Sequence, residues 1–130
     1  MYAQGSSAYN TYKNNSVNFA SREQLLLMLV EGAVKFSKIG RQAIVDKNIP
    51  KAHENIVKTQ NIFNELMVTL DVQKGGEWAK SLFSVYDFIV RRLTDANIKK
   101  DVEIMDEVIG LIEDIKDTWN EAYKLSKTVK

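Results

Sequence analysis

The apolar residues of the chain recur at helical spacing over four segments. They repeat every three or four residues over about 22–45, 49–71, 77–97 and 102–125, which is the spacing of amphipathic helices. Short turns separate these segments, and no run alternates apolar and polar residues over the length of a strand. The pattern predicts an all-α fold, an antiparallel up-down four-helix bundle.

The segment 77–97 has the widest apolar surface of the four. Its apolar arc spans roughly 220° of a helix, whereas a single buried stripe needs only ~100°. Such a helix needs more than one neighbour to cover it, so we expect it to be the central helix of the bundle. The expected stripe is Trp78, Ala79, Leu82, Tyr86, Ile89, Leu93 and Ala96, with Phe83, Val85, Phe88 and Val90 on its flanks.

Several residues mark the ends of the helices. Ser21 begins a capping box, and Pro50 is tolerated in a first helical turn because its missing N–H would be unpaired there. Gly76 ends the turn 73–76, in which glycine tolerates left-handed conformations. We expect Asn97 to end the third helix in the same way, and Asp101 to cap the fourth.

The first twenty residues differ from the rest. Residues 1–20 are small, polar and rich in Gly, Ser and Asn, yet they include Tyr9, Tyr12 and Val17. We therefore divide the chain into a flexible arm or short helix at 1–20 and a bundle at 21–126. Two interpretations of the arm stay open: a disordered tail, or a segment that docks its aromatic rings on the bundle.

The first two helices carry apolar residues beyond their expected core stripes. Six consecutive apolar residues at 25–30 cannot all be buried by a single contact. Either this helix is wedged between two neighbours of its own bundle, or part of the excess faces a partner. On the second helix, apolar positions separated by amides suit peptide binding but are also common on helix surfaces. The candidate partner-binding residues on these helices are Leu26, Val30, Val57, Gln60, Asn64 and Val68.

The fourth helix is acidic on the side away from its apolar stripe. Between Asp101 and Leu125 there are eight acidic residues against Lys116 and Lys124, a net charge of −6. The plain interpretation is a solvated face.

Composition limits the partners and the compartment. The net charge of +1 over 130 residues creates no long-range field that would attract nucleic acid or an anionic membrane. No cysteine is present, so disulfides and thiolate metal sites are excluded. The first residues lack a signal-peptide pattern, and no apolar run is long enough to span a bilayer. We expect a single cytoplasmic domain without membrane insertion.

Catalytic patterns are lacking. His53 is the only histidine, no motif provides a nucleophile beside it, and Gly75-Gly76 is not followed by the Lys-Ser/Thr of a phosphate-binding loop. We therefore predict no enzyme, no cofactor and no metal site. A histidine phosphotransfer module that uses His53 stays open as a lesser alternative, although Glu54 would place a carboxylate beside the phosphoryl group.

Taken together, the arm and the helices resemble the flagellin-specific export chaperone family of the flagellar type III secretion system. The resemblance covers nearly the whole chain and rests on the order and spacing of several short motifs. Arg22 replaces the usual helix-opening proline, and Val30 replaces a common tyrosine. The motifs are Ala8-Tyr9-x-x-Tyr12, Asn15-Ser16-Val17, Leu25-x-x-Met28-Leu29-x-x-Gly32, Gln60-x-Ile62-x-x-Glu65-Leu66, Leu70-Asp71, Gly75-Gly76-Glu77, Tyr86-Asp87, Arg92-Leu93-x-x-Ala96-Asn97 and Trp119.

This resemblance implies a non-enzymatic chaperone that binds the disordered carboxy-terminal segment of flagellin. Such a protein keeps flagellin from polymerising in the cytoplasm and presents it for export, with components of the flagellar export gate as further partners. The competing class is a helical assembly subunit whose extra apolar surface makes a homodimer.

Overall fold

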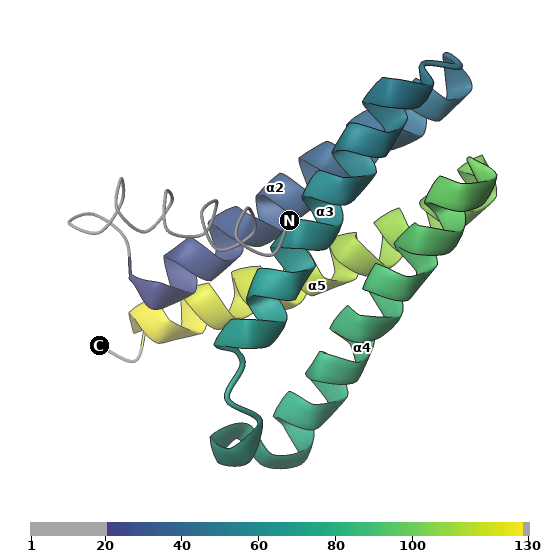
Figure 1. Cartoon of the computed structure of the whole chain (residues 1–130). Coiled ribbons are helices and arrows are strands. Elements are labelled where there is room, and N and C mark those ends of the chain that lie inside the picture. Colours follow the sequence, from purple (N-terminus) through teal and green to yellow (C-terminus); the bar gives the residue numbers. More distant parts are fainter. Residues whose placement is uncertain (1–20, 129–130) are drawn as a thin grey trace.

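The computed structural model describes residues 21–128, which form four helices and no strand. They are α2 (Arg22–Val45), α3 (Ile49–Thr69), α4 (Val72–Lys99) and α5 (Val102–Thr128) (Figure 1). The predicted all-α fold is confirmed, and the predicted helix bounds are close to the observed ones.

The helices pack as a ring in which each contacts its two neighbours. α2 packs against α3 and α5, and α4 packs against the same two helices from the other side. The α2–α3 and α4–α5 turns lie at the same end of the molecule (Figure 1). Every neighbouring pair is therefore antiparallel, as predicted for an up-down bundle.

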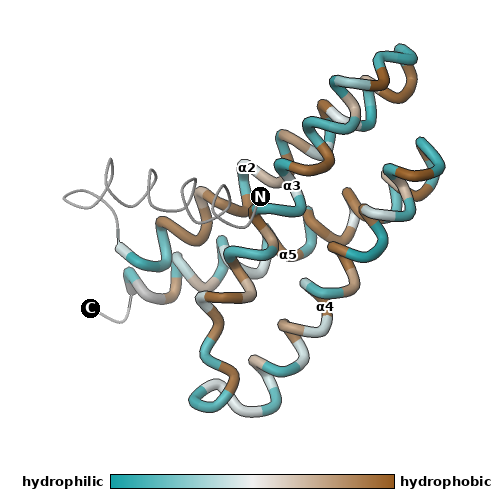
Figure 2. Tube along the Cα trace, in the orientation of Figure 1, coloured by the Kyte–Doolittle hydropathy of each residue, from teal (hydrophilic) through white to brown (hydrophobic). Residues whose placement is uncertain are grey.

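The core takes residues from all four helices. Leu29 of α2, Ile56 and Phe63 of α3, Leu93 of α4 and Ile112 of α5 are almost completely buried. Apolar and polar residues alternate along each helix, as expected for amphipathic helices that share one core (Figure 2).

Glycine permits a close contact between α2 and α3 at Gly40. A Cβ atom added to Gly40 would lie 3.3 Å from Cγ1 of Ile56 and 3.6 Å from Cβ of Asn55. The first distance is tighter than an ordinary van der Waals contact, so an added side chain would require Ile56 to shift by a few tenths of an ångström.

Two predicted caps are present. The backbone N–H of Gln24 donates to Oγ of Ser21 at 3.1 Å, and the N–H of Ile104 donates to Oδ1 of Asp101 at 3.2 Å. Each side chain satisfies a backbone donor that the first helical turn leaves unpaired.

The prediction that Asn97 ends α4 is wrong. The helix continues to Lys99, and Lys100 adopts the left-handed conformation with φ 49°. The ammonium group of Lys100 donates to the side-chain oxygen of Asn97 at 2.8 Å. The left-handed residue is thus tied back onto the last turn of the helix.

The connection from α3 to α4 also differs from the expectation. α3 ends at Thr69, and Asp71 caps a further helical turn by accepting from the N–H of Lys74 at 3.0 Å. Gly76, with φ 60° and ψ −140°, then interrupts the helix before the long part of α4. The sequence correctly indicated a break at Gly76 but missed the turn of helix before it.

The prediction that 77–97 is the central helix is wrong. Its expected stripe is largely buried, but Trp78 is 58% exposed and the flanking residues Phe83, Val85 and Phe88 are 38%, 37% and 41% exposed. α4 contacts only α3 and α5, and no other helix of the described chain covers its outer side. The helix with the most buried residues is α2.

One buried hydroxyl group makes the stability of this core depend on pH. Tyr86 is 1% exposed, its hydroxyl oxygen accepts from Nε1–H of Trp119 at 2.9 Å, and its ring lies 5.6 Å from that of Phe63. Burial raises the pKa of Tyr86 to about 12, although the hydrogen bond from Trp119 acts in the opposite direction. The folded protein therefore holds this proton more tightly than the unfolded chain does.

We expect this tyrosine to weaken the fold in alkali. Because the unfolded chain releases the proton near pH 10, stability is retained below about pH 10 and falls as pH rises toward 12. Between pH 8.5 and 11, the free energy of unfolding of the native chain should fall by roughly 1 kcal/mol more than that of Tyr86→Phe. Urea denaturation followed by circular dichroism at both pH values measures this difference. Parallel losses in the two proteins would contradict it.

Candidate functional site

The α3 residues nominated from the sequence lie on one side of that helix. His53, Val57, Gln60, Asn64 and Val68 follow one another at spacings of three or four, so they form a single stripe. Asn64 is exposed, Val68 is 66% exposed, and Val57 is half-buried. The stripe therefore presents apolar surface interrupted by amide groups.

Gln60 fixes this stripe against α4. Its Nε2 atom donates to the carbonyl oxygen of Val90 at 3.0 Å and to the hydroxyl of Thr94 at 2.9 Å. Nearer the end of the molecule that carries the α2–α3 and α4–α5 turns, Nδ2 of Asn97 and Nδ1 of His53 lie 2.9 Å apart. Gln60 thus has a structural role. The carbonyl oxygen of its side chain has no hydrogen-bond partner among the described residues.

On α4, a matching stripe runs beside the one on α3. Phe83, Val90, Thr94 and Asn97 lie on one side of the helix by their spacing. The antiparallel register set by the two contacts above places Phe83 at the same level as Val68. We call the exposed surface formed by these two stripes the α3–α4 face, and its largest exposed apolar groups are Val68 and Phe83.

An aromatic pocket lies at the same end of the bundle. It has a volume of about 320 Å³ and is lined by residues of all four helices, among them Leu26, Leu70, Tyr86 and Trp119. Trp78 also lines it and contacts the ring of Trp119 edge-on, with the ring centroids 6.3 Å apart. The pocket thus lies where α3 ends and α4 begins, and aromatic and aliphatic side chains form much of its lining.

The expectation that Leu26 and Val30 lie on the surface is wrong. Leu26 is 5% exposed and Val30 is completely buried, and both belong to the main core cluster. The reason is that α2 packs against both α3 and α5, so it buries a wider arc than one contact would require. Of the two interpretations of the apolar run at 25–30, the helix wedged between neighbours is the one observed.

Three nominated residues cannot be placed. Tyr9, Tyr12 and Val17 lie outside the described residues, so their part in binding stays a prediction.

The sequence analysis missed the exposure of three apolar residues of α4, which are Phe83, Val85 and Phe88. All three were assigned to a covered central helix. The signal was present in the apolar arc of roughly 220°, because two neighbouring helices cannot enclose so wide an arc.

Some acidic side chains of α5 form ion pairs with a neighbouring helix, which the sequence analysis did not expect. Arg41 of α2 contacts the carboxylate of Asp106, and Nζ of Lys38 lies 3.0 Å from the carboxylate of Glu113. These acids therefore tie α5 to α2, and the interpretation as a simple solvated face is incomplete.

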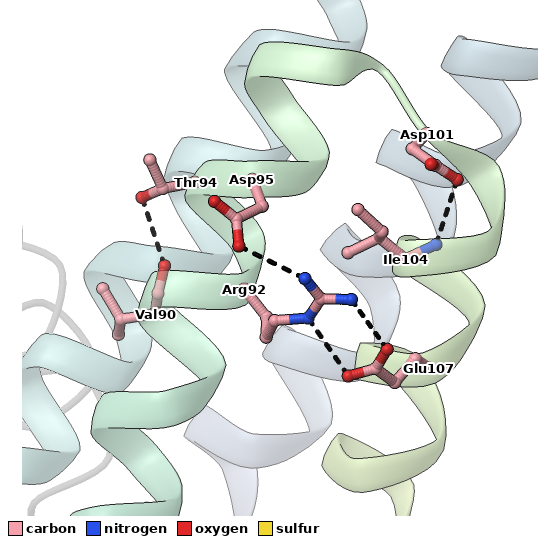
Figure 3. A network of polar contacts seen from close by, with 7 residues as sticks. All are labelled: Val90, Arg92, Thr94, Asp95, Asp101, Ile104 and Glu107. Atoms are coloured by element: carbon pink, nitrogen blue, oxygen red, sulfur yellow. Dashed lines mark hydrogen bonds and ion pairs between the residues drawn. The ribbon is translucent and has the colours of Figure 1, made fainter.

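A further ion pair joins α5 to α4. The guanidinium of Arg92 donates to both carboxylate oxygens of Glu107, at 2.9 and 3.1 Å, and to Asp95 at 3.2 Å (Figure 3). The hydrogen bonds from Arg92 hold the pKa of Glu107 below its usual value. This bidentate contact joins α4 to α5 in a defined geometry.

Nothing in residues 21–128 forms a metal-binding group of three or more His, Asp or Glu side chains. His53 is exposed, and its one hydrogen-bond partner among these described residues is the side-chain amide of Asn97. None of the described helices combines the length and hydropathy needed to cross a membrane.

Comparisons with known proteins agree with this description. The family model described as flagellar protein FliS matches residues 5–126. The flagellar secretion chaperone FliS of Bacillus subtilis (strain 168) is 40% identical over 114 residues, which cover 88% of this chain and 84% of that protein. The protein of the same name from Escherichia coli (strain K12) is 34% identical over 125 residues, covering 94% and 92%.

A solved structure described as a flagellar chaperone from bacteria has the same fold. It superposes with a TM-score of 0.74 at 19% identity and covers 91% of this chain and 96% of its own. The curated relatives are named as chaperones, a non-enzymatic class, as the sequence predicted for this chain. The chain therefore belongs to the FliS family of flagellar secretion chaperones.

Proposed function

We propose that this chaperone binds the disordered carboxy-terminal segment of flagellin in the cytoplasm. Binding would prevent premature polymerisation and deliver flagellin to the flagellar type III export apparatus, where components of the export gate would be further partners. The observation that carries the proposal is the α3–α4 face, where Val68 and Phe83 are exposed on a rigid bundle beside amide groups.

The chemistry of the α3–α4 face suits a client that folds as it binds. A disordered segment must offset the loss of its conformational entropy with buried apolar area. Val57, Val68 and Phe83 provide apolar contacts along the face. The free carbonyl of Gln60 and the exposed amide of Asn64 can pair with polar groups of the client.

The arm completes the proposed site. Tyr9, Tyr12 and Val17 would add contacts to the client or cover the apolar surface in its absence. Tyrosine suits such a role because its ring is apolar while its hydroxyl stays hydrated.

We expect Val68→Asp to weaken flagellin binding at least tenfold, because a carboxylate would be placed in the apolar contact. Since Val68 is 66% exposed, the free energy of unfolding should change by no more than ~0.5 kcal/mol. Val45→Asp is the matched control, because Val45 is 49% exposed at the end of α2, away from this face. Calorimetric titration with the carboxy-terminal peptide of flagellin measures the affinity. Equal affinities of the two variants would contradict the assignment.

A second pair of variants tests which side of α4 the client contacts. Phe83→Ala should weaken flagellin binding several-fold, whereas Phe88→Ala should leave it nearly unchanged. The two phenylalanines lie on one helix and are 38% and 41% exposed, so the substitutions remove similar exposed groups. Fluorescence anisotropy of a labelled flagellin peptide separates the outcomes. A larger loss in Phe88→Ala would move the client to the other side of the helix.

The homodimer alternative predicts a different result. If the α3–α4 face served only self-association, Val68→Asp would convert a dimer into a monomer and leave flagellin unbound in both proteins. Light scattering coupled to size exclusion, with and without the flagellin peptide, distinguishes the two functions.

A further inference from the structure

A hollow of about 760 Å³ lies between α4 and α5, away from the α3–α4 face. Phe88 of α4 lines it, together with Gly110 and Leu111 of α5. Because Phe83 and Phe88 are five residues apart, they point about 140° away from each other around α4. The hollow is therefore a separate surface, and Phe88 is its largest exposed apolar group.

Gly110 has no explanation within the described chain. It lies in the middle of α5, where glycine costs about 1 kcal/mol relative to alanine. A Cβ atom at this position would meet nothing within 4 Å, so no contact with residues 21–128 requires its absence. The missing side chain leaves the α5 backbone open to close approach by another chain.

The charge around this hollow is negative. Four carboxylates and one ammonium group line it. Those of Glu107 and Glu113 are already paired with Arg92 and Lys38. The remaining two belong to Asp114 and Asp117, which form no ion pair among the described residues. They follow Gly110 by four and seven residues, so they lie on the same side of α5.

We propose that this surface, which we call the α4–α5 face, docks a cationic amphipathic helix of a protein other than the client. The helix would lie against the backbone at Gly110 and place an apolar side chain between Phe88 and Leu111. Its lysine or arginine residues would pair with Asp114 and Asp117. A helix that packs into the space between two antiparallel helices is a common mode of peptide recognition.

The negative charge of the α4–α5 face favours a basic helix over a second copy of the chain, nucleic acid or an anionic membrane. A second copy of the chain in a symmetric dimer would bring its own Asp114 and Asp117 toward the same groups, and like charges in a contact are unfavourable. Nucleic acid and anionic membranes carry the same sign and would be repelled. A basic helix satisfies both the apolar and the acidic parts of the surface.

The test uses two synthetic 18-residue peptides with the same leucine and alanine stripe. One carries lysines beside the stripe and the other carries glutamates. We expect the lysine peptide to bind at least tenfold more tightly in low salt and to shift amide resonances of Phe88, Gly110 and Leu111 in NMR spectra. Equal binding of the two peptides, or shifts confined to other helices, would overturn the proposal.

Variants localise the contact. Gly110→Trp should weaken binding of the lysine peptide at least tenfold by blocking close approach, and Asp114→Lys combined with Asp117→Lys should do the same by reversing charge. Gly110→Ala controls for helix stabilisation and should change binding much less than Gly110→Trp. Thermal unfolding confirms that each variant is folded. Full affinity in folded Gly110→Trp would rule this site out.

The two surfaces are distinguished by measuring binding of the lysine peptide to both phenylalanine variants and in the presence of the flagellin peptide. Phe88→Ala should weaken the lysine peptide several-fold, while Phe83→Ala should not. Saturation with the flagellin peptide should leave binding of the lysine peptide intact. If flagellin displaces it, the α4–α5 face belongs to the client and the proposal of a second partner fails. Because flagellin affinity is measured independently, such a failure is distinct from a failure of the proposed client function.

Discussion

The apolar arc of α4 is wider than two neighbouring helices can cover, and the character of the molecular surface follows from this mismatch. In a ring of four helices, α4 meets α3 on one side and α5 on the other. Ala79, Ile89 and Leu93 reach the core, while Phe83 and Phe88 stay exposed on opposite flanks. These two phenylalanines are the exposed apolar groups on which the two proposed binding surfaces are built.

The orientation of α4 about its own axis decides which phenylalanine faces which neighbour. The buried residues of α4 are few, so the polar contacts on its two flanks matter for this orientation. Gln60 holds the α3 side through Val90 and Thr94, and Arg92 holds the α5 side through Glu107. A rotation of the helix by one residue, about 100°, would break both sets of contacts and move both phenylalanines.

The sequence predicted the fold class, the helix bounds to within a few residues and the core stripe of each helix, because all of these depend on periodicity and caps. The sequence did not predict which apolar residues beside these stripes are exposed. Val30 and Phe83 are both apolar residues beside a core stripe, yet one is completely buried and the other is 38% exposed. Both helices pack against α3 and α5, but α2 packs against them more extensively than α4 does, and periodicity within one helix contains no information about how closely its neighbours pack. For the same reason, Gln60 was correctly placed beside Val57 and Asn64, but its contacts with α4 could not be foreseen.

The acids of α5 show how pairing changes the meaning of a charged surface. Counted along the sequence, they form one strip of net charge −6. In the folded chain, Asp106 and Glu113 pair with bases of α2 and Glu107 pairs with a base of α4, so these acids join α5 to its neighbours. Asp114 and Asp117 form no ion pair among the described residues, and they lie beside exposed apolar surface and a glycine whose backbone is open to close approach. In the roles proposed above, the unpaired negative charge of the α4–α5 face would select a partner by sign, whereas the α3–α4 face, with amides in place of carboxylates, would select by apolar contact and hydrogen bonding. α4 thus borders two proposed binding surfaces whose chemistry differs.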